Sequence, residues 1–226
     1  MRAPLTVVIP TLNAASALPA LMQGMMEANQ SGILREVVIS DGGSHDTTHI
    51  IAEDAGTLWC VGPAGRGGQL KRGAALAGGE WLLFLHSDTQ LPEGWSAKVC
   101  QHMEYPQKAA YFRLKFGSPV WAAKAVAGWA NLRSRMLDLP YGDQGLLISR
   151  SLYDQVGGYQ DIPLMEDVAL AQSLKGKLVV LDATVTTSAE RYEKNGWLRR
   201  GCKNLLTLLR YLKGASPEDL AKAYRR

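Results

Sequence analysis

Two acidic residues and one histidine follow apolar segments that have the length and composition of buried strands. Asp41 follows the segment 36–40. His86 and Asp88 follow the segment 81–85. Because the carboxyl ends of parallel strands line the ligand crevice of an open α/β sheet, we expect these side chains at one edge of one sheet. A carboxylate and an imidazole can both ligate a divalent cation, so the pattern predicts a site where a nucleotide and a metal ion meet.

The segments that would position these residues alternate between strand and helix in the first half of the chain. We predict strands over 5–9, 36–40, 57–61 and 81–85, and helices over 15–28, 46–54 and 69–77. Ser16 is a candidate cap of the first helix, and Pro19 is suited to its first turn. Right-handed crossovers make these strands parallel, so the predicted fold class is α/β, with a mainly parallel sheet flanked by helices.

The second half of the chain predicts less regular structure. Apolar and polar residues alternate over 110–116, which is typical of a strand with one buried face. The other predicted elements are helices over 119–138, 164–174 and 196–213, strands over 145–149 and 178–181, and a last helix that Ser216 would cap. We expect one domain over 1–190, with a nucleotide-binding half (1–90) and an acceptor half (91–190). A basic amphipathic helical tail would follow over 191–226.

Composition and charge exclude several classes of protein. Hydrophobic residues make up 46% and charged residues 20%, which is ordinary for a globular domain and argues against disorder. The net charge of +4 arises in the tail, which has ten Lys and Arg residues against three Asp and Glu residues. The basic residues of the tail show neither the pattern of interleaved aromatic residues nor the module of a nucleic-acid reader, so we expect no nucleic-acid partner.

Cysteine spacing and hydropathy indicate a reduced, cytoplasmic protein. The three cysteines have no short spacing, so they predict neither a zinc site nor a disulfide framework. The first predicted strand begins by Leu5, which leaves no room for a signal peptide. The apolar runs are about five residues long, much shorter than the roughly 20 residues that span a bilayer.

Four segments together resemble the family 2 glycosyltransferases, which are inverting enzymes with the GT-A fold. The segments read Ile9-Pro10-Thr11-Leu12-Asn13-Ala14, Ser40-Asp41-Gly42-Gly43-Ser44-His45-Asp46-Thr47, Arg66 to Gly73, and Glu166-Asp167. The chain is most similar to a small bacterial subgroup with a Gly-Arg-Gly-Gly-Gln loop and a Tyr-Gly-Asp-Gln-Gly turn. The resemblance implies a nucleoside-diphosphate sugar donor, Mg²⁺ or Mn²⁺, and transfer to an acceptor hydroxyl. The Gln-x-x-Arg-Trp signature of processive synthases is absent, which argues against a processive membrane enzyme.

The resemblance places the nucleotide at the carboxyl ends of the first predicted strands and at the glycine-arginine segment, Arg66 to Gly73. Asp41 would accept a hydrogen bond from the imide N–H of uracil, which favours a UDP-sugar; the alternative is a turn aspartate. The other expected contacts of the first loops are Pro10, Thr11, Asn13, Gly42 and Ser87. Arginine pairs well with phosphate oxygens and glycine allows close approach, so diphosphate or base contacts are expected from Arg66, Gln69 and Arg72. A surface arginine beside a plain glycine loop is the alternative.

The metal-binding position departs from the usual Asp-x-Asp motif of the family, because it reads His86-Ser87-Asp88. We expect Asp88 to hold Mg²⁺ or Mn²⁺ on the diphosphate, where the ion would act as a Lewis acid. His86 is a second candidate ligand, and manganese tolerates nitrogen better than magnesium does. The alternative is a capping Asp88 beside a core histidine.

The acid pair and the Tyr-Gly-Asp-Gln-Gly turn are the candidates for catalysis and acceptor binding. In the family the general base is an acid at this position, so Asp167 is expected to take the proton of the acceptor hydroxyl. Glu166 would orient Asp167 or bind the acceptor. Two acids at a helix N-terminus also stabilise the helix, which is the alternative. Asp143 and Gln144 are candidates for acceptor contact, unless they only form a turn.

The predicted helix over 196–213 combines a leucine stripe with basic residues. We expect the stripe to pack on the domain or on a second subunit in a homodimer. Alternatively, it lies on an anionic membrane surface and reaches a lipid-linked acceptor.

Two other functions stay open. A nucleotidyltransferase shares the α/β layout but places its glycine-rich loop directly after the first strand. A degenerate nucleotide-sugar-binding protein without catalysis would explain the missing first metal acid.

Overall fold

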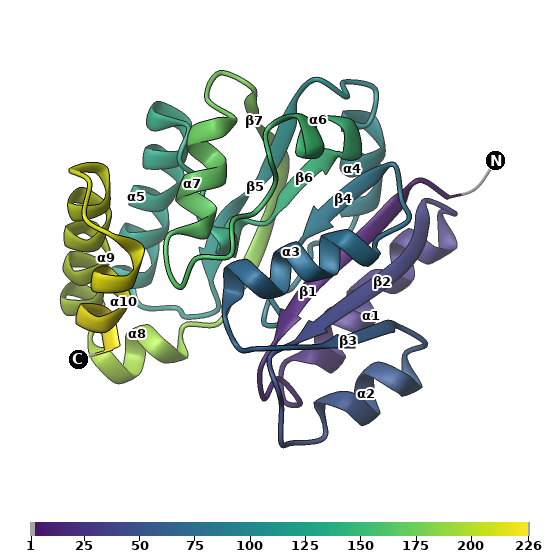
Figure 1. Ribbon diagram of the computed structural model, residues 1–226, viewed down its shortest axis with the longest axis horizontal. Coiled ribbons are helices and arrows are strands. Elements are labelled where there is room, and N and C mark those ends of the chain that lie inside the picture. The colour runs from purple at the N-terminus through teal and green to yellow at the C-terminus, as the bar shows by residue number, and fades with distance from the viewer. Residues whose placement is uncertain (1–2, 226) are drawn as a thin grey trace.

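A seven-stranded sheet forms the centre of the molecule, and helices cover both of its faces (Figure 1). The computed structural model describes residues 3–225. The strands are β1 (Leu5–Thr11), β2 (Leu34–Asp41), β3 (Leu58–Val61), β4 (Trp81–Phe84), β5 (Ala109–Phe116), β6 (Leu146–Ser149) and β7 (Leu178–Thr187). Their order in the sheet is β3-β2-β1-β4-β6-β5-β7. Strands β1 to β4 pair in parallel, which confirms the prediction for the first half.

The second half of the sheet is mixed in direction. β6 is antiparallel to both β4 and β5, whereas β5 and β7 are parallel. β7 extends well beyond the predicted 178–181, because Thr184 to Thr187 continue the pairing with Arg113 to Phe116 of β5. Polar residues interrupt the apolar pattern in this part of β7, so the sequence alone did not indicate the extension.

Ten helices lie between or after the strands in the described part of the chain. They are α1 (Leu18–Gln30), α2 (Thr48–Asp54), α3 (Arg66–Leu76), α4 (Trp95–His102), α5 (Trp121–Leu137), α6 (Arg150–Gln155), α7 (Glu166–Ser173), α8 (Glu190–Asn195), α9 (Trp197–Leu212) and α10 (Pro217–Arg225), and a 3-10 turn, η1, spans Gly142–Gln144. The short helices α4, α6 and α8 were not predicted. α3 begins at Arg66 and not at Gln69, so part of the predicted glycine loop is helical.

The ends of two helices test the predicted caps. Pro19 lies in the first turn of α1 as predicted, but the cap prediction for Ser16 is wrong. The N-cap position is Ala17, which has no side chain that can accept the hydrogen bond. At α10 the Ser216 hydroxyl accepts a hydrogen bond from the N–H of Asp219 at 3.1 Å, which confirms the predicted cap.

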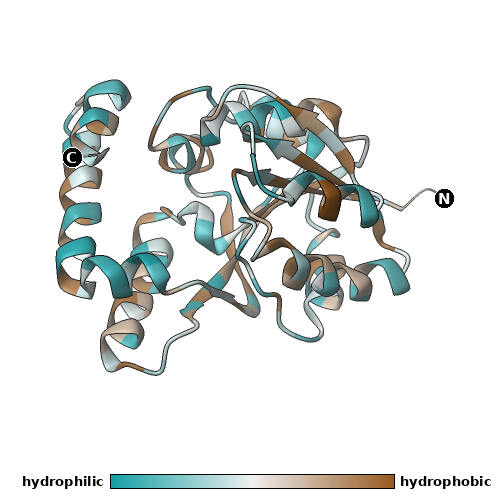
Figure 2. Ribbon diagram, turned by 90° about the horizontal axis from the view of Figure 1, so that it is seen from below, coloured by the Kyte–Doolittle hydropathy of each residue, from teal (hydrophilic) through white to brown (hydrophobic). Residues whose placement is uncertain are grey.

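Alternating strand residues build a hydrophobic core on each face of the sheet. Val7 and Leu83 point to the face that α1, α2, α4 and α5 cover. Val8 and Phe84 point to the face that α3, α6 and α7 cover. Burial of a large apolar side chain stabilises the fold by roughly 1.5–3 kcal/mol, so the core on each face of the sheet contributes substantially to the stability of the fold. Figure 2 shows hydrophobic residues along the strands inside the molecule and mixed colours on the helices around them.

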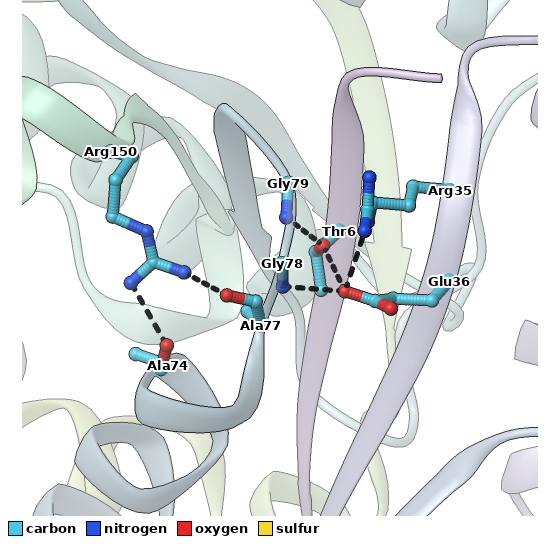
Figure 3. Close-up of polar contacts among 8 residues, drawn as sticks. All are labelled: Thr6, Arg35, Glu36, Ala74, Ala77, Gly78, Gly79 and Arg150. Carbon is cyan, nitrogen blue, oxygen red and sulfur yellow. Dashed lines mark hydrogen bonds and ion pairs between the residues drawn. The ribbon is translucent and has the colours of Figure 1, made fainter. Parts of the chain in front are cut away.

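A group of polar contacts anchors the C-terminal end of α3 at the edge of the sheet where β1 and β4 begin (Figure 3). Arg150 donates hydrogen bonds to the carbonyl oxygens of Ala74 and Ala77 at 2.9 and 2.5 Å. The Glu36 carboxylate accepts a hydrogen bond from the N–H of Gly78 at 2.6 Å. Because these contacts fix one end of α3, its first turn is held at the opposite edge, beside the C-terminal ends of β1 and β2.

The C-terminal helices lie at the end of the molecule opposite the N-terminus (Figure 1). α9 packs against α5, α8 and α10. The packed face of α9 includes Thr207 and Leu208, which are buried. The predicted stripe consists of Leu198, Cys202, Leu205, Leu209 and Leu212, and all five are exposed, with Leu198 78% and Leu212 45% exposed. The expected packing of the stripe on the domain is therefore wrong, and Leu205 only borders a cleft that α9 forms with α5.

Candidate active site

The C-terminal ends of β1 and β2 meet at one edge of the sheet, as the sequence predicted. Thr11 and Asp41 are the last paired residues of these strands. The Thr11 hydroxyl donates a hydrogen bond to Asp41 Oδ1 at 2.8 Å. The chain then turns at Gly42, whose N–H donates to the Thr11 carbonyl oxygen at 2.8 Å. Pro10 lies next to this pair and is half-buried.

The Asp41 carboxylate organises the turn after β2. Its Oδ2 accepts hydrogen bonds from the N–H groups of Gly43 and Ser44 at 2.7 and 2.6 Å. Its Oδ1 accepts a second bond from the Ser44 hydroxyl at 2.6 Å, beside the one from Thr11. Burial acts to raise the pKa of Asp41, but these hydrogen bonds outweigh burial and lower it. The side chain thus performs the turn role that the sequence left open as the alternative.

Asn13 and Asp46 join the first loop to the loop after β2. Asn13 has a φ of +51°, in the left-handed region that asparagine tolerates. Its side-chain oxygen accepts a hydrogen bond from the N–H of His45 at 2.9 Å. The Asp46 carboxylate accepts hydrogen bonds from the N–H and hydroxyl of Thr48, the first residue of α2, and therefore stabilises the beginning of that helix.

Two of the three candidate side chains of α3 are used inside the protein. The Gln69 amide donates to the carbonyl oxygens of Thr11 and Ser40 at 2.7 and 2.8 Å, and Gln69 is 5% exposed. Arg72 donates to the Asp41 carbonyl oxygen at 3.0 Å. The Arg66 side chain differs, because it is 40% exposed. Arg66 is therefore the arginine of α3 that is placed to meet a ligand.

His86 and Asp88 follow β4 as predicted, with Ser87 half-buried between them. In the described part of the chain, the buried Nε2 atom of His86 has no hydrogen-bond partner. Burial lowers the pKa of His86 well below its ordinary value, and the charges of Arg66 and Arg191 lower it further. The imidazole is therefore neutral near pH 7, which is the form that ligates metals.

The Tyr-Gly-Asp-Gln-Gly turn brings η1 against His86 and α7. A Cβ atom added to Gly142 would lie 2.7 Å from His86 Nε2, so a side chain at this position would displace the imidazole. The N–H of Gly142 donates a hydrogen bond to Asp167 Oδ2 at 2.8 Å. On the other side of His86, Asp88 Oδ2 accepts a hydrogen bond from the Thr187 hydroxyl at 3.3 Å.

The acid pair begins α7 and faces α3. Glu166 is 3% exposed, and its Oε1 lies 3.7 Å from Nε of Arg66. Burial raises the pKa of Glu166 to about 7, and the charge of Asp167 adds to this effect, whereas Arg66 opposes it. Asp167 is half-buried, and its Oδ2 is aligned by the N–H of Gly142. The pair thus combines a buried acid that is easily protonated with a more accessible carboxylate.

Asp143 and Gln144 occupy different environments although they are adjacent. Burial raises the pKa of Asp143 to about 6; Arg133 opposes this effect, while Asp167 and Asp88 add to it. Gln144 is 0% exposed, and its amide makes hydrogen bonds with Ser134, Asn131 and the carbonyl oxygen of Phe112. Gln144 therefore joins β5 to α5 and has no exposed surface for an acceptor.

The structure thus gathers six of the predicted side chains around one point at the sheet edge. They are Arg66, His86, Asp88, Asp143, Glu166 and Asp167. Sequence reasoning missed Arg133 and gave no role to Gly142. Arg133 is 5% exposed and its guanidinium lies 3.4 Å from the ring centre of Tyr141. Its position among small residues on the buried face of α5 is the signal that could have identified it.

The donor set at the sheet edge fits a metal ion that is shared with a diphosphate. Among residues 3–225, no group of three or more His, Cys, Asp and Glu side chains is arranged to hold a metal by itself. Magnesium is commonly held by one or two carboxylates together with substrate phosphates and water. The Asp88 carboxylate and the unpartnered Nε2 of His86 match that kind of site.

Comparison with known proteins identifies the family. The profile described as "Glycosyl transferase family 2" matches residues 6–148. The chain belongs to glycosyl transferase family 2. The family 2 match includes the nucleotide- and metal-binding candidates and ends before Glu166 and Asp167. A "PGL/p-HBAD biosynthesis glycosyltransferase" of Mycobacterium bovis is 39% identical over 101 residues. This alignment covers 41% of the chain, and the chain spans 39% of the length of that relative.

Solved structures share the fold of this family 2 chain. The mannosyltransferase PcManGT from Pyrobaculum calidifontis, in complex with GDP-Man and Mn²⁺, has a TM-score of 0.66 and 16% identity. The alignment covers 100% of this chain and 69% of the PcManGT chain. S. aureus TarS 1-349 in complex with UDP-GlcNAc has a TM-score of 0.60 and 19% identity, covering 82% of this chain and 58% of its own. These likenesses show that the fold is the GT-A fold, as predicted.

Proposed function

We propose that the protein transfers a sugar from a nucleoside-diphosphate sugar, with UDP as the favoured nucleotide, to an acceptor hydroxyl. One observation carries the proposal. Arg66 of α3, Asp88 after β4 and Asp167 of α7 come from three separate elements, and, besides burial, the charges of all three act on the pKa of the Asp143 carboxyl between them. A cation, a metal-binding carboxylate and an aligned base are the groups that this reaction requires.

The donor would bind across the ends of β1, β2 and β4. Arg66 is the exposed cation for the diphosphate, and Asp88 with His86 would hold Mg²⁺ or Mn²⁺ there. When bound, the ion would neutralise charge on the leaving nucleoside diphosphate. Asp41 would contact the base N–H in place of the Ser44 hydroxyl, which donates to its Oδ1 in the structure.

The transfer would proceed in one displacement with inversion at the anomeric carbon. The acceptor oxygen forms the new bond to this carbon, while the bond to the diphosphate oxygen breaks and its electron pair stays on the diphosphate. Asp167 accepts the proton of the acceptor hydroxyl. The N–H of Gly142 holds one oxygen of the Asp167 carboxylate, which leaves the side chain in a defined orientation. Glu166 would orient Arg66 through their ion pair.

Two rival functions make different use of the same residues. A nucleotidyltransferase needs its glycine-rich loop directly after β1, but here the glycine-arginine segment lies at the beginning of α3. A degenerate binding protein would keep the nucleotide site without transfer. The buried, aligned acid pair of α7 supports catalysis over this second rival.

Nucleotide-dependent thermal shifts test the donor site, and an isosteric variant tests the base. UDP with Mn²⁺ should raise the melting temperature, whereas UDP with EDTA should not, because a ligand of the native state stabilises it by mass action. Asp167→Asn should keep this shift and lose about 10²- to 10⁴-fold in sugar transfer. Asp154→Asn, at an exposed acid of α6, is the matched control. A normal rate in Asp167→Asn would place the base elsewhere, and no shift with any nucleoside diphosphate would contradict the donor site.

We further propose that the exposed stripe of α9 rests on an anionic membrane surface. In the described part of the chain no helix is long and apolar enough to cross a bilayer. α5 and α9 carry basic residues and no acidic ones, and their exposed residues include Trp121, Met136 and Leu198. Basic amphipathic helices bind anionic lipid by apolar insertion and charge attraction.

A vesicle sedimentation assay tests this contact. The protein should sediment with phosphatidylglycerol vesicles and less with phosphatidylcholine vesicles. Leu198→Glu should reduce sedimentation, whereas Ile50→Glu on the exposed surface of α2 should not. Equal sedimentation of both variants would contradict the contact. A concentration-dependent dimer that Leu198→Glu dissociates would instead assign the stripe to a second copy of the chain.

A further inference from the structure

A cleft between β5, α5 and α9 opens beside the candidate active site. Its enclosed volume is about 40 Å³, and the rest of the cleft is open to solvent. The lining residues include Phe116, Trp129, Tyr141, Asp143, Tyr192 and Leu205. Ligand sites in proteins commonly combine apolar walls with a few polar groups. The enclosed part therefore has room for a polar group, and the lining of the open part matches the apolar body of a small organic molecule.

The polar end of the cleft is formed by Arg133 and Asp143. Arg133 is 5% exposed, and its Nε donates to the Leu139 carbonyl oxygen at 3.0 Å. Its buried Nη2 and the buried Oδ1 of Asp143 have no hydrogen-bond partner among the described residues. An unsatisfied buried polar group costs about 1–3 kcal/mol, so a ligand that pairs with both atoms is favoured. One donor and one acceptor of opposite charge suit a neutral hydroxyl group, which accepts from one and donates to the other.

The rest of the cleft suits an apolar or aromatic body. The Phe116 and Tyr192 rings pack edge to face with centroids 4.9 Å apart. At the mouth, Trp129 is 49% and Leu205 is 37% exposed, although both are large apolar side chains. Aromatic and aliphatic walls bind apolar surface by removing it from water. The two ends of the cleft together describe an amphiphilic ligand with its hydroxyl group at the inner end.

The inner end of the cleft adjoins the proposed base. Asp143 follows Gly142, and the N–H of Gly142 bonds Asp167 Oδ2 at 2.8 Å. Tyr141 lines this cleft and also the small pocket that Asp167 lines, and the pKa of Asp143, raised first by burial, is raised further by the charge of Asp167, so the inner end of the cleft lies close to the proposed base. We propose that the cleft is the acceptor site and that the acceptor is an alcohol or phenol on an apolar or aromatic body. This inference rests on the proposed glycosyl transfer.

Direct binding of a model acceptor tests the cleft without any activity measurement. The probe is 4-butylphenol, and the matched probe without a hydroxyl group is butylbenzene; both are titrated by ligand-observed NMR. We expect 4-butylphenol to bind at least about tenfold more tightly than butylbenzene, since a missing hydroxyl leaves buried polar groups unpaired. Equal affinity for the two probes, or no binding of 4-butylphenol, would overturn the inference.

A pair of adjacent variants locates the probe. Leu205→Asp places a charge at the mouth of the cleft, whereas Leu206→Asp places it on the neighbouring residue, which is 61% exposed and does not line the cleft. Leu205→Asp should weaken 4-butylphenol binding at least about tenfold, and Leu206→Asp should leave it unchanged. Circular dichroism confirms that both variants are folded. Binding that both variants retain would place the probe elsewhere and refute the assignment.

The donor titration separates failure of the cleft from failure of the proposed function. Leu205→Asp should keep the thermal shift with UDP and Mn²⁺, because Leu205 lies outside the donor site. A shift with UDP but no phenol binding would overturn the acceptor assignment alone. Phenol binding in the cleft without any nucleotide shift would overturn the proposed transfer and, with it, the role of the cleft as an acceptor site.

Discussion

The charge state of Glu166 couples the candidate active site to the stability of the fold. Folding raises the pKa of this carboxyl from its ordinary 4.5 to about 7, first by burial and then through the charge of Asp167. The folded protein therefore holds a proton that the unfolded chain releases. Stability from this proton is present below about pH 4.5 and is lost as the pH rises towards about 7. Glu166→Gln replaces the protonated acid by a neutral side chain of the same shape.

The expected gain in stability follows from the two pKa values. At 1.36 kcal/mol per pKa unit, the ionised Glu166 side chain costs about 3 kcal/mol above pH 8. Because Glu166 is 3% exposed, solvent screens this cost little. Near pH 5 the folded wild-type side chain is already protonated, so the gain should fall below about 1 kcal/mol. For a chain of this size the gain above pH 8 corresponds to roughly 6–12 °C in melting temperature.

Urea unfolding of wild-type protein and Glu166→Gln at about pH 5 and about pH 8.5 measures this effect. Glu104→Gln, an exposed carboxylate after α4, is the control and should show no pH-dependent gain. A gain that is the same at both pH values would refute the reasoning, because a constant effect comes from packing and not from ionisation. A destabilised Glu166→Gln at pH 8.5 would show that the ion pair with Arg66 outweighs burial.

Three further substitutions test the geometry of the site and its supports. Gly142→Ala should reduce transfer more than tenfold and weaken Mn²⁺-dependent UDP binding, because its Cβ would meet His86 Nε2 at 2.7 Å; an unchanged rate with unchanged binding would contradict this contact. Gln144→Ala should cost about 2–4 kcal/mol in urea unfolding, since it leaves buried polar groups unpaired. A stability loss below about 0.5 kcal/mol would argue against that structural role. Arg150→Ala should cost about 1–3 kcal/mol by freeing two carbonyl oxygens of α3, and wild-type stability would show that this anchor is unimportant.

Sequence patterns were most informative where a candidate site residue lies directly at the end or the beginning of a predicted strand or helix. Asp41, Asp88 and Glu166 each follow or begin a segment whose periodicity predicts its own structure, so their place at the sheet edge could be inferred. The parallel half of the sheet followed from the alternation of strands and helices. The second half was harder, because β6 reverses direction and the polar part of β7 is recruited by pairing with β5 and not by its own pattern.

The use of each polar side chain could not be read from the sequence. Gln69 and Arg66 lie in one helix and have similar chemistry, yet Gln69 bonds two strand carbonyl oxygens while Arg66 faces the open edge. Likewise, Asp143 faces a cleft, whereas the adjacent Gln144 faces the interior of the protein. Which partner a polar group finds depends on residues far away in the chain.

The sequence by itself determined the family, the α/β architecture and the set of residue types that could handle a nucleotide, a metal and a proton. Local periodicity, strand ends and motif spacing are enough for this, because they depend on neighbours within a few residues. Only the tertiary structure decided that the leucine stripe of α9 is exposed and that Gln144 is buried. It also decided that Arg133 and Asp143 share one cleft. These outcomes depend on how β5, α5 and α9 pack together, which no short stretch of the chain encodes.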